Sequence, residues 1–515
     1  MISDPGNTLF AWSAPVGRNV PVTPSLRATE GSVAISPFLR VRRTVGLLRR
    51  SAPRNDTRER GCRTHGSVFL ACAAVILFGL LVGAQPASAQ LTLLDKITEA
   101  RNRMDGRELL HQLTTVRKAV PMAATSNGQG GKPAVRYVTH RALNRDVAVT
   151  GLNLKTGEFK DLIFQETVVL EPKKRPQARP PQLIARENGC DVTWRGGSRW
   201  GFNRDLLLTC HGEEFTVINL TMWTSRTSRS VVIDQKTGKR ACRQDPPEQM
   251  IGSYVPYSPE LHTPDVADAG RRYLERTIMQ ALQDLDNLNV TSRTFADENV
   301  SGLTSFDFIH ALLIDEHTDP DEFVRNQTNG SPARLIEKYW VEVGVNQASA
   351  FRMSVSPAGA MGISQFICPT YARILDESPE ARLNPVFLHG MQDHVNAVKA
   401  SIVLFDADMS LWWSPTVKKV CSISPEMLED CLAVSYNGGP NRLNRVIARR
   451  GLDWFKRDTV SRTGRRHLAS RLKEETVTYL AKLQSIRGHL LARERPTYPP
   501  LDAPLKEQGG GALSD

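Results

Sequence analysis

The sequence lacks the short motifs that mark metal and phosphate sites. It contains neither a C-x-x-C pair nor an H-E-x-x-H helix, so no metal site is expected. A glycine cluster at residues 126–133 is without the strand and the helix that a phosphate-binding loop requires, and it is predicted to be a linker. No serine or cysteine stands in a motif that would activate it as a nucleophile.

The net positive charge is small once the first 65 residues are set aside. The chain has a net charge of +12, but residues 1–65 contribute +7 of it through eleven arginines and four acids. The remainder of the chain is only mildly basic. This charge distribution argues against a nucleic-acid partner.

Only one long apolar run is present, at residues 68–83. Three arginines precede it, and an Ala-x-Ala site follows it. Its 16 residues are fewer than the roughly 20 that span a bilayer. The pattern predicts a signal peptide cleaved after Ala89, and therefore a periplasmic or secreted protein. If the signal were not cleaved, the run would anchor the protein in the membrane.

Residues 1–57 are unlike a signal peptide, because they are rich in arginine, contain proline and lack a helical pattern. No methionine lies between Met1 and Met104. We therefore expect translation to begin downstream of Met1 at a non-methionine codon, and residues 1–89 to form a leader outside the fold.

Export makes disulfides plausible for the cysteines that remain after the leader. Cys421 with Cys431 is the first predicted pair, and Cys190 with Cys210 is the second. The six cysteines of the mature chain are Cys190, Cys210, Cys242, Cys368, Cys421 and Cys431.

The mature chain changes its periodicity twice, which predicts an α+β multidomain protein. Residues 91–120 have helical spacing, and the segment 90–133 is predicted to be a helix and a linker. Residues 134–255 show short alternating runs around Lys-Thr-Gly turns and predict a small β-rich accessory domain without a catalytic motif. Residues 262–492 return to helical spacing. Residues 493–515 have little to bury and are expected to be disordered.

The stretch SPAGAMGISQF, residues 356–366, has the composition of a ligand-binding loop. Its glycines and alanines keep side chains out of the way, so that a ligand can lie against backbone. Gln365 offers both a donor and an acceptor. Tyr436 and Asn437 precede a Gly-Gly-Pro turn. Taken alone, Tyr436 and Tyr479 are also compatible with hydrogen-bonded aromatic residues of the core.

Four motifs in the helical part resemble those of the soluble lytic transglycosylases. SVSPAGAMGISQF resembles the family signature S-P-x-G-A-x-G-L-M-Q. DHVNAVKASIVLF, LAVSYNGGPNRL and EETVTYLAKL are similar to three further family motifs and follow in the family order. The resemblance covers residues 330–490, about a third of the chain. It implies that the C-terminal, mainly α-helical domain has a lysozyme-like fold.

The resemblance also implies an activity and a set of substrate-binding residues. Members of the family cleave the MurNAc–GlcNAc β-1,4 bond of peptidoglycan without a cofactor and leave a 1,6-anhydromuramoyl end. The residues implied to bind glycan are Gln347, Ser356, Gly359, Ala360, Gly362, Gln365, Tyr436, Asn437 and Tyr479.

The family's catalytic glutamate has no counterpart at the matching position. That glutamate stands in E-S-x-F-N-P, twelve residues before the glycine that corresponds to Gly359. Here the position holds Gln347, or Ala348 when ASAF is aligned instead. Neither side chain can supply the proton that a glycosidic leaving oxygen needs.

Two glutamates elsewhere are candidates for the acid. Glu316 follows the apolar stripe of FDFIHALLID and continues its spacing onto the inner helix face, where the pKa of a carboxyl rises. Glu342, the second candidate, lies at the edge of the stripe in LIEKYWVEVG. A chain without a catalytic acid would instead be a peptidoglycan-binding protein. A lysozyme-like hydrolase is a third alternative, and it would need a second carboxylate to activate water.

Overall fold

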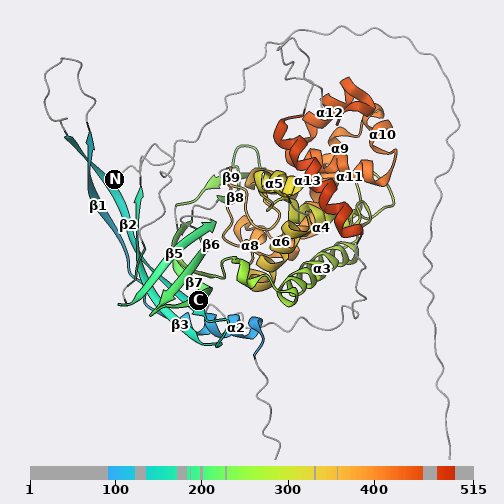
Figure 1. Ribbon diagram of the computed structural model, residues 1–515. Coiled ribbons are helices and arrows are strands. Elements are labelled where there is room, and N and C mark those ends of the chain that lie inside the picture. Colours follow the sequence, from blue (N-terminus) through green and yellow to red (C-terminus); the bar gives the residue numbers. More distant parts are fainter. Residues whose placement is uncertain are drawn as a thin grey trace, which may run out of the picture. The chain divides into compact units, whose positions relative to one another are not determined.

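The structure is a computed structural model that describes residues 91–121, 135–170, 183–185, 187–197, 201–226, 229–246, 248–329, 332–356, 358–455 and 472–492. These residues belong to one compact unit and combine antiparallel β-sheet with many helices, so the predicted mixture of α and β structure is confirmed (Figure 1). None of the described helices has both the length and the hydropathy needed to cross a membrane. The predicted leader, the glycine-rich linker and the predicted disordered tail lie outside the described residues.

The first helix, α2 (Leu93–Met104), is shorter than the sequence predicted. Thr92 and Asp95 form a capping box at its start. The predicted helix over residues 91–120 is wrong in its second half, where β1 (His111–Pro121) forms instead. An Asp-Gly turn with Gly106 at φ 72° ends the helix, and residues 114–116 are all β-branched, which favours a strand. β1 is paired with β2 along its whole length, a long-range interaction that outweighs the local helical spacing.

The main sheet has eight antiparallel strands within the described residues. Its strands run in the order β4-β3-β2-β7-β6-β5, while β1 pairs with β2 and β10 pairs with β7. The predicted turn at the Lys-Thr-Gly of residues 155–157 is confirmed between β2 and β3, where the side chain of Asn153 accepts hydrogen bonds from the backbone of Lys155 and Thr156. The remaining strands of the sheet are β2 (Val135–Leu152), β3 (Phe159–Leu170), β4 (Leu183–Ala185), β5 (Cys190–Gly197), β6 (Arg204–Cys210), β7 (Glu213–Arg226) and β10 (Glu248–Tyr254).

A buried ionic cluster lies inside this sheet. Glu166 is fully buried and accepts hydrogen bonds from Arg145 Nε at 2.9 Å and from Arg204 Nη1 at 2.9 Å. A buried charge is stable only when its partners replace the water it has lost. The three side chains therefore fix β2, β3 and β6 relative to one another.

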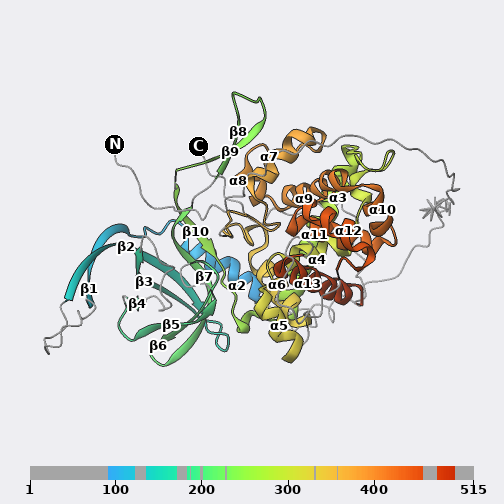
Figure 2. The ribbon, with the colours of Figure 1, turned by 90° about the horizontal axis from the view of Figure 1, so that it is seen from above.

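A second hairpin, β8 (Arg229–Ile233) and β9 (Arg240–Gln244), lies beside α7 and α8 (Figure 2). The predicted strands on either side of the turn at residues 236–238 are confirmed. The structure confirms the disulfides Cys421–Cys431 and Cys190–Cys210 and adds Cys242–Cys368, which joins β9 to α7. That third bond links residues 126 positions apart.

The helical part contains the helices that the 3.6-residue spacing predicted, with additional short ones between them. Pro or a hydrogen-bonding cap marks many of the starts. The helices are α3 (Pro264–Asn287), α4 (Phe306–Asp315), α5 (Pro320–Asn329), α6 (Pro332–Asn346), α7 (Cys368–Glu377), α8 (Phe387–Gln392), α9 (His394–Trp412), α10 (Pro415–Cys421), α11 (Pro425–Gly438), α12 (Pro440–Arg450) and α13 (Glu474–Leu491). Among the described residues, short 3₁₀ turns precede α3 at Pro259–Leu261 and lie between later helices at Val300–Gly302, Gln347–Ser349, Pro379–Ala381 and Gly451–Asp453.

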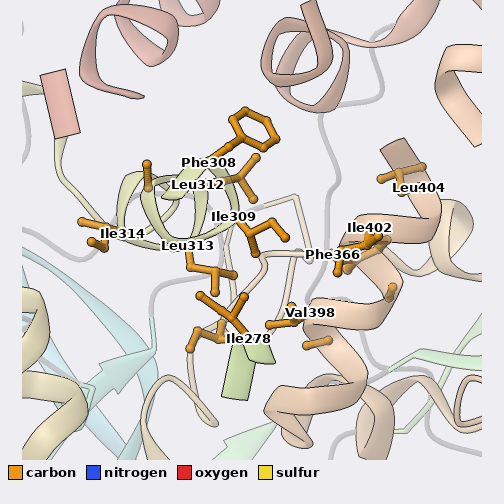
Figure 3. Packing of buried hydrophobic residues seen from close by; sticks show 14 of the residues in the cluster. Ile278, Phe308, Ile309, Leu312, Leu313, Ile314, Phe366, Val398, Ile402 and Leu404 are labelled. Atoms are coloured by element: carbon orange, nitrogen blue, oxygen red, sulfur yellow. The ribbon is translucent and has the colours of Figure 1, made fainter. Parts of the chain in front are cut away.

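Helices α4 and α9 form the centre of the hydrophobic core. Figure 3 shows apolar side chains of α4 beside residues of α3 and α9 and beside Phe366. Residues 307–315 of α4 are all buried. Helices α3 and α6 approach so closely that a side-chain carbon on Gly270 would lie 1.8 Å from the carbonyl oxygen of Trp340. Glycine is the residue that permits this contact.

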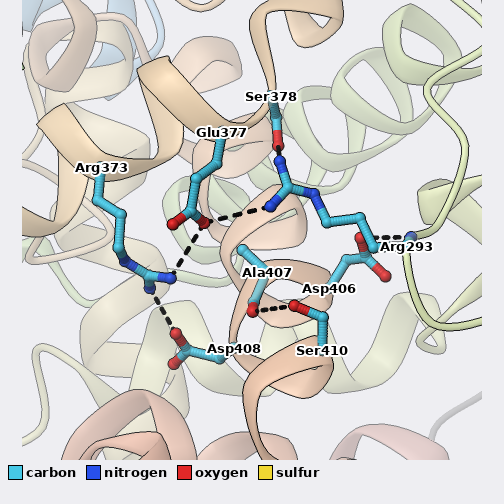
Figure 4. Close-up of polar contacts among 8 residues, drawn as sticks. All are labelled: Arg293, Arg373, Glu377, Ser378, Asp406, Ala407, Asp408 and Ser410. Carbon is cyan, nitrogen blue, oxygen red and sulfur yellow. Dashed lines mark hydrogen bonds and ion pairs between the residues drawn. The ribbon is translucent and has the colours of Figure 1, made fainter. Parts of the chain in front are cut away.

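Polar contacts hold α7 and α9 together on another side of the core (Figure 4). Arg373 donates to Asp408 at 2.5 Å and pairs with Glu377 at 3.2 Å. Glu377 also pairs with Arg293, whose backbone N–H donates to Asp406. Because α7 directly follows the loop at residues 356–366, these contacts fix the position of the loop's C-terminal end.

Candidate active site

Glu316 lies at the end of α4, where this helix leaves the core. Ser305 caps the start of α4 by accepting a hydrogen bond from the backbone N–H of Phe308. The helix is buried through Asp315, whereas Glu316 is part-exposed. Glu316 therefore lies at the border between the core and the part-exposed residues that follow α4.

Tyr479 on α13 holds the carboxyl of Glu316 in place. Its Oη donates a hydrogen bond to Glu316 Oε1 at 2.7 Å. Burial and the charge of Glu316 both raise the pKa of Tyr479 well above its usual value, so the phenol stays protonated and remains a donor. Tyr479 thus fixes the direction of one carboxyl oxygen and leaves the other without this constraint.

Burial raises the pKa of Glu316 to about 7, although the hydrogen bond from Tyr479 and the charge of Lys482 both lower it. Desolvation penalises the charged form of a carboxyl, and here that effect is the largest of the three. A carboxyl with a pKa near neutrality can donate a proton to a leaving group at the pH of most extracellular compartments. Glu316 is thus chemically suited to act as a general acid.

Lys482, one turn after Tyr479 on α13, holds the backbone at either side of Glu316. Its Nζ donates to the carbonyl oxygens of Asp315 at 2.9 Å and Thr318 at 2.7 Å. It also pairs with Asp315 Oδ1 at 3.4 Å, where the Asp315 side chain is fully buried. Sequence reasoning missed Lys482, although its spacing of three residues from Tyr479 put both side chains on one helix face.

The loop at residues 356–366 is attached to the end of α4 and to α11. His317 Nε2 hydrogen-bonds the carbonyl oxygen of Ile363 at 3.0 Å, and Tyr436 Oη donates to the carbonyl oxygen of Ser364 at 2.5 Å. Burial lowers the pKa of His317 to about 3, so this ring is neutral and donates from Nε2. Burial raises the pKa of Tyr436 well above its usual value, and the negative charge of Glu316 raises it further, so this phenol stays protonated.

Two small residues of the loop, Gly362 and Ser356, serve its internal packing. Gly362 has φ 72°, and a side-chain carbon there would lie 2.3 Å from the carbonyl oxygen of Met391. The sequence predicted open space for a ligand at this glycine, but the backbone at Met391 fills it. Ser356 Oγ accepts from the backbone N–H of Ala360 at 3.0 Å and closes the turn.

Two further positions of the loop, Gly359 and Gln365, are part-exposed. Gly359 has φ 82°, and the nearest atoms to a side chain there would belong to Arg229. Gln365 has φ 48° and donates from Nε2 to the carbonyl oxygen of Gly362 at 2.8 Å. Asn437, at the end of α11, is part-exposed beside Tyr436 in sequence.

Glu342, the second candidate acid, binds to the sheet. Its Oε1 accepts hydrogen bonds from Asn203 Nδ2 and Tyr254 Oη, both at 2.8 Å. Burial raises its pKa too, and the side chain is almost inaccessible. These contacts give Glu342 a structural role between α6 and the sheet. The structure thus supports Glu316 over Glu342 as the candidate acid.

Gln347, which the predicted resemblance aligns with the catalytic glutamate of the transglycosylases, lies in the 3₁₀ turn Gln347–Ser349 after α6. It is exposed and has φ 46°. The structure joins Glu316 to Tyr479 by a direct hydrogen bond, and the next residue, His317, hydrogen-bonds the loop that Tyr436 also contacts.

Comparison with known proteins adds no assignment to this site. No protein-family model matches the chain, and it matches neither a curated protein nor a solved structure.

Proposed function

We propose that the chain is an exported murein lytic transglycosylase and that Glu316 is its catalytic acid. The observation that carries the proposal is the carboxyl of Glu316, which has a pKa raised to about 7 and is held by Tyr479 at 2.7 Å. It lies at the helix end that binds the SPAGAMGISQF loop, the segment most similar to the family signature. The four motif resemblances supply the substrate class.

The proposed reaction needs one carboxyl in two roles. Glu316 protonates the glycosidic oxygen as the bond from muramoyl C1 to that oxygen breaks. The 6-hydroxyl oxygen of the same sugar then bonds to C1, and its proton passes to the Glu316 carboxylate. The products are a free 4-hydroxyl on GlcNAc and a 1,6-anhydro ring, and the acid is restored without water. Tyr436, Gln365 and Asn437 are proposed to orient the sugar.

The surroundings of Asp315 and Glu342 favour this reaction over hydrolysis. A hydrolase of the lysozyme type needs a second carboxylate that faces the sugar. Asp315 is fully buried against Lys482, and Glu342 is bound by Asn203 and Tyr254. Neither is free to activate a water molecule.

Three disulfides support export. Cysteine pairs of this kind persist in oxidising compartments such as the periplasm. Together with the predicted signal peptide they favour a periplasmic or secreted enzyme, in which peptidoglycan is within reach.

A second candidate function is peptidoglycan binding without cleavage. Gln347 at the family's catalytic position favours it, because a glutamine cannot replace the acid. Incubation of purified sacculi with the mature protein separates the two functions. Release of soluble muropeptides supports the enzyme, whereas co-sedimentation with intact sacculi and no release supports the binding protein.

Replacing Tyr479 with phenylalanine is expected to slow muropeptide release by about tenfold and to raise the pKa of Glu316 further. The phenol lowers that pKa through its hydrogen bond, and a bond to a charged group contributes about 1.5–3 kcal/mol. The measurement is the pH dependence of turnover. Tyr371→Phe is the control, since Tyr371 is a buried tyrosine whose Oη donates to the carbonyl oxygen of Asn384. An unchanged pH profile in Tyr479→Phe would count against the proposed contact.

A further inference from the structure

The β8–β9 hairpin carries an arginine to the glycine loop. A side-chain carbon on Gly359 would lie 3.5 Å from Cζ and 3.7 Å from Nη1 of Arg229, which is ordinary van der Waals distance. Arg229 begins β8, more than 120 residues before the loop. The accessory strands therefore add a positive charge directly beside a loop of the helical part.

The register of the hairpin explains the direction of Arg229. Residues two apart in a strand point to the same face, and so do directly paired residues. Val231 is two residues from Arg229 and pairs with Cys242, which forms the disulfide to Cys368. Val231 and Cys242 both pack against the helical core. Arg229 consequently points toward the helices rather than away from them.

The hairpin is fastened where it meets α7. The disulfide Cys242–Cys368 joins β9 to the first residue of α7. Arg240 reinforces this contact, because its Nη1 pairs with Asp376 Oδ1 at 2.6 Å and its backbone N–H donates to Asp376 Oδ2. A fastened hairpin holds the backbone at Arg229 in position, so that only the side chain has to be ordered when a ligand binds.

No carboxylate of the described residues forms a salt bridge with Arg229, and the side chain is part-exposed. A guanidinium presents a planar set of donors that matches a carboxylate in two hydrogen bonds. The glycans that the proposed enzyme cleaves bear peptide substituents on muramic acid, and these carry carboxylates. The position of Arg229 beside the loop thus suits the peptide rather than the sugar chain.

We propose that Arg229 forms a subsite for a carboxylate of the peptide substituents on the glycan strand. The inference rests on the proposed function, because it takes the loop to be the part that carries the glycan. It gives the hairpin of the β-rich region a role in substrate selection. Strands bearing charged peptides would be preferred over strands whose carboxylates are neutralised.

Binding to sacculi tests the subsite separately from cleavage. Glu316→Gln serves as the parent protein so that the sacculi stay intact, and Arg229→Gln is added to it. Co-sedimentation is measured on native sacculi and on sacculi whose carboxylates have been converted to amides with carbodiimide and ammonia. We expect Arg229→Gln to raise the Kd for native sacculi about three- to tenfold and to leave the Kd for amidated sacculi unchanged.

Arg243→Gln is the matched control. Arg243 lies on β9 opposite Ser230, so it belongs to the other face of the same hairpin, and it is exposed. Loss of binding in Arg229→Gln alone supports the subsite. Equal losses in both variants, or no loss in Arg229→Gln, would overturn it. If the wild-type protein releases muropeptides but Arg229→Gln binds native sacculi normally, only the subsite is overturned. If Arg229→Gln binds native sacculi more weakly but the wild-type protein releases no muropeptides, only the proposed enzyme is overturned.

Discussion

Replacing Glu316 with glutamine is expected to slow the release of anhydromuropeptides by about 10²- to 10⁴-fold, the usual contribution of a general acid. Glutamine has nearly the same shape, and its carbonyl oxygen can still accept the hydrogen bond from Tyr479. The variant therefore keeps the site and removes only the acidic proton. Liquid chromatography of the soluble products gives the rate.

Glu342→Gln is the matched control for this variant. Glu342 is also a buried glutamate with a raised pKa, and its Oε1 accepts two hydrogen bonds that a glutamine oxygen can accept as well. Its turnover should stay within about twofold of the wild-type rate, the range expected of a residue outside the chemistry. A large loss in Glu342→Gln with normal turnover in Glu316→Gln would transfer the role of the acid to Glu342.

The rate of turnover should be level on the acid side of pH 7 and fall about tenfold per pH unit on the alkaline side. The acid acts only when protonated, and the pKa of Glu316 is about 7. The same group becomes the base after proton transfer, so it adds no decline at low pH. A bell-shaped profile with an acidic limb would indicate a second catalytic carboxylate and contradict the single-acid reaction.

The stability of the protein should show the same titration. The pKa of Glu316 is higher in the folded chain, about 7, than its ordinary value of 4.5, so the folded state binds more protons between these values. The free energy of unfolding therefore decreases as pH rises from 4.5 to 7, so the folded protein becomes less stable. Urea unfolding of Glu316→Gln and of the wild type at pH 5 and pH 8 measures this effect. The free energy of unfolding of the variant, relative to that of the wild type, should be higher at pH 8 than at pH 5.

Most secondary structure followed from local pattern, and the failures came from distant partners. The stripe in residues 306–315 and the Lys-Thr-Gly turns predicted α4 and the two hairpins directly. Residues 111–120 had helical spacing as well, but their pairing with β2 decided the outcome. The disulfide Cys242–Cys368 could not be predicted, because no local signal relates residues 126 positions apart.

The candidate site was predictable in its parts but not in its connections. Helical spacing put Glu316 on the inner face of an apolar helix, and the motif resemblance selected Tyr479. Their hydrogen bond depends on how α13 crosses α4, which the sequence does not specify. The contacts of Lys482 depend on the same crossing. Gly362 was interpreted as space for a ligand because nothing in the sequence shows that Met391 approaches it.

The measurement that tests the central claim most directly is the mass of muropeptides released from sacculi in water enriched in ¹⁸O. If Glu316 directs attack by the sugar's own 6-hydroxyl, the products end in anhydro rings and contain no ¹⁸O at C1. Reducing ends that carry one ¹⁸O would show that water is the nucleophile and would contradict the proposed transglycosylase.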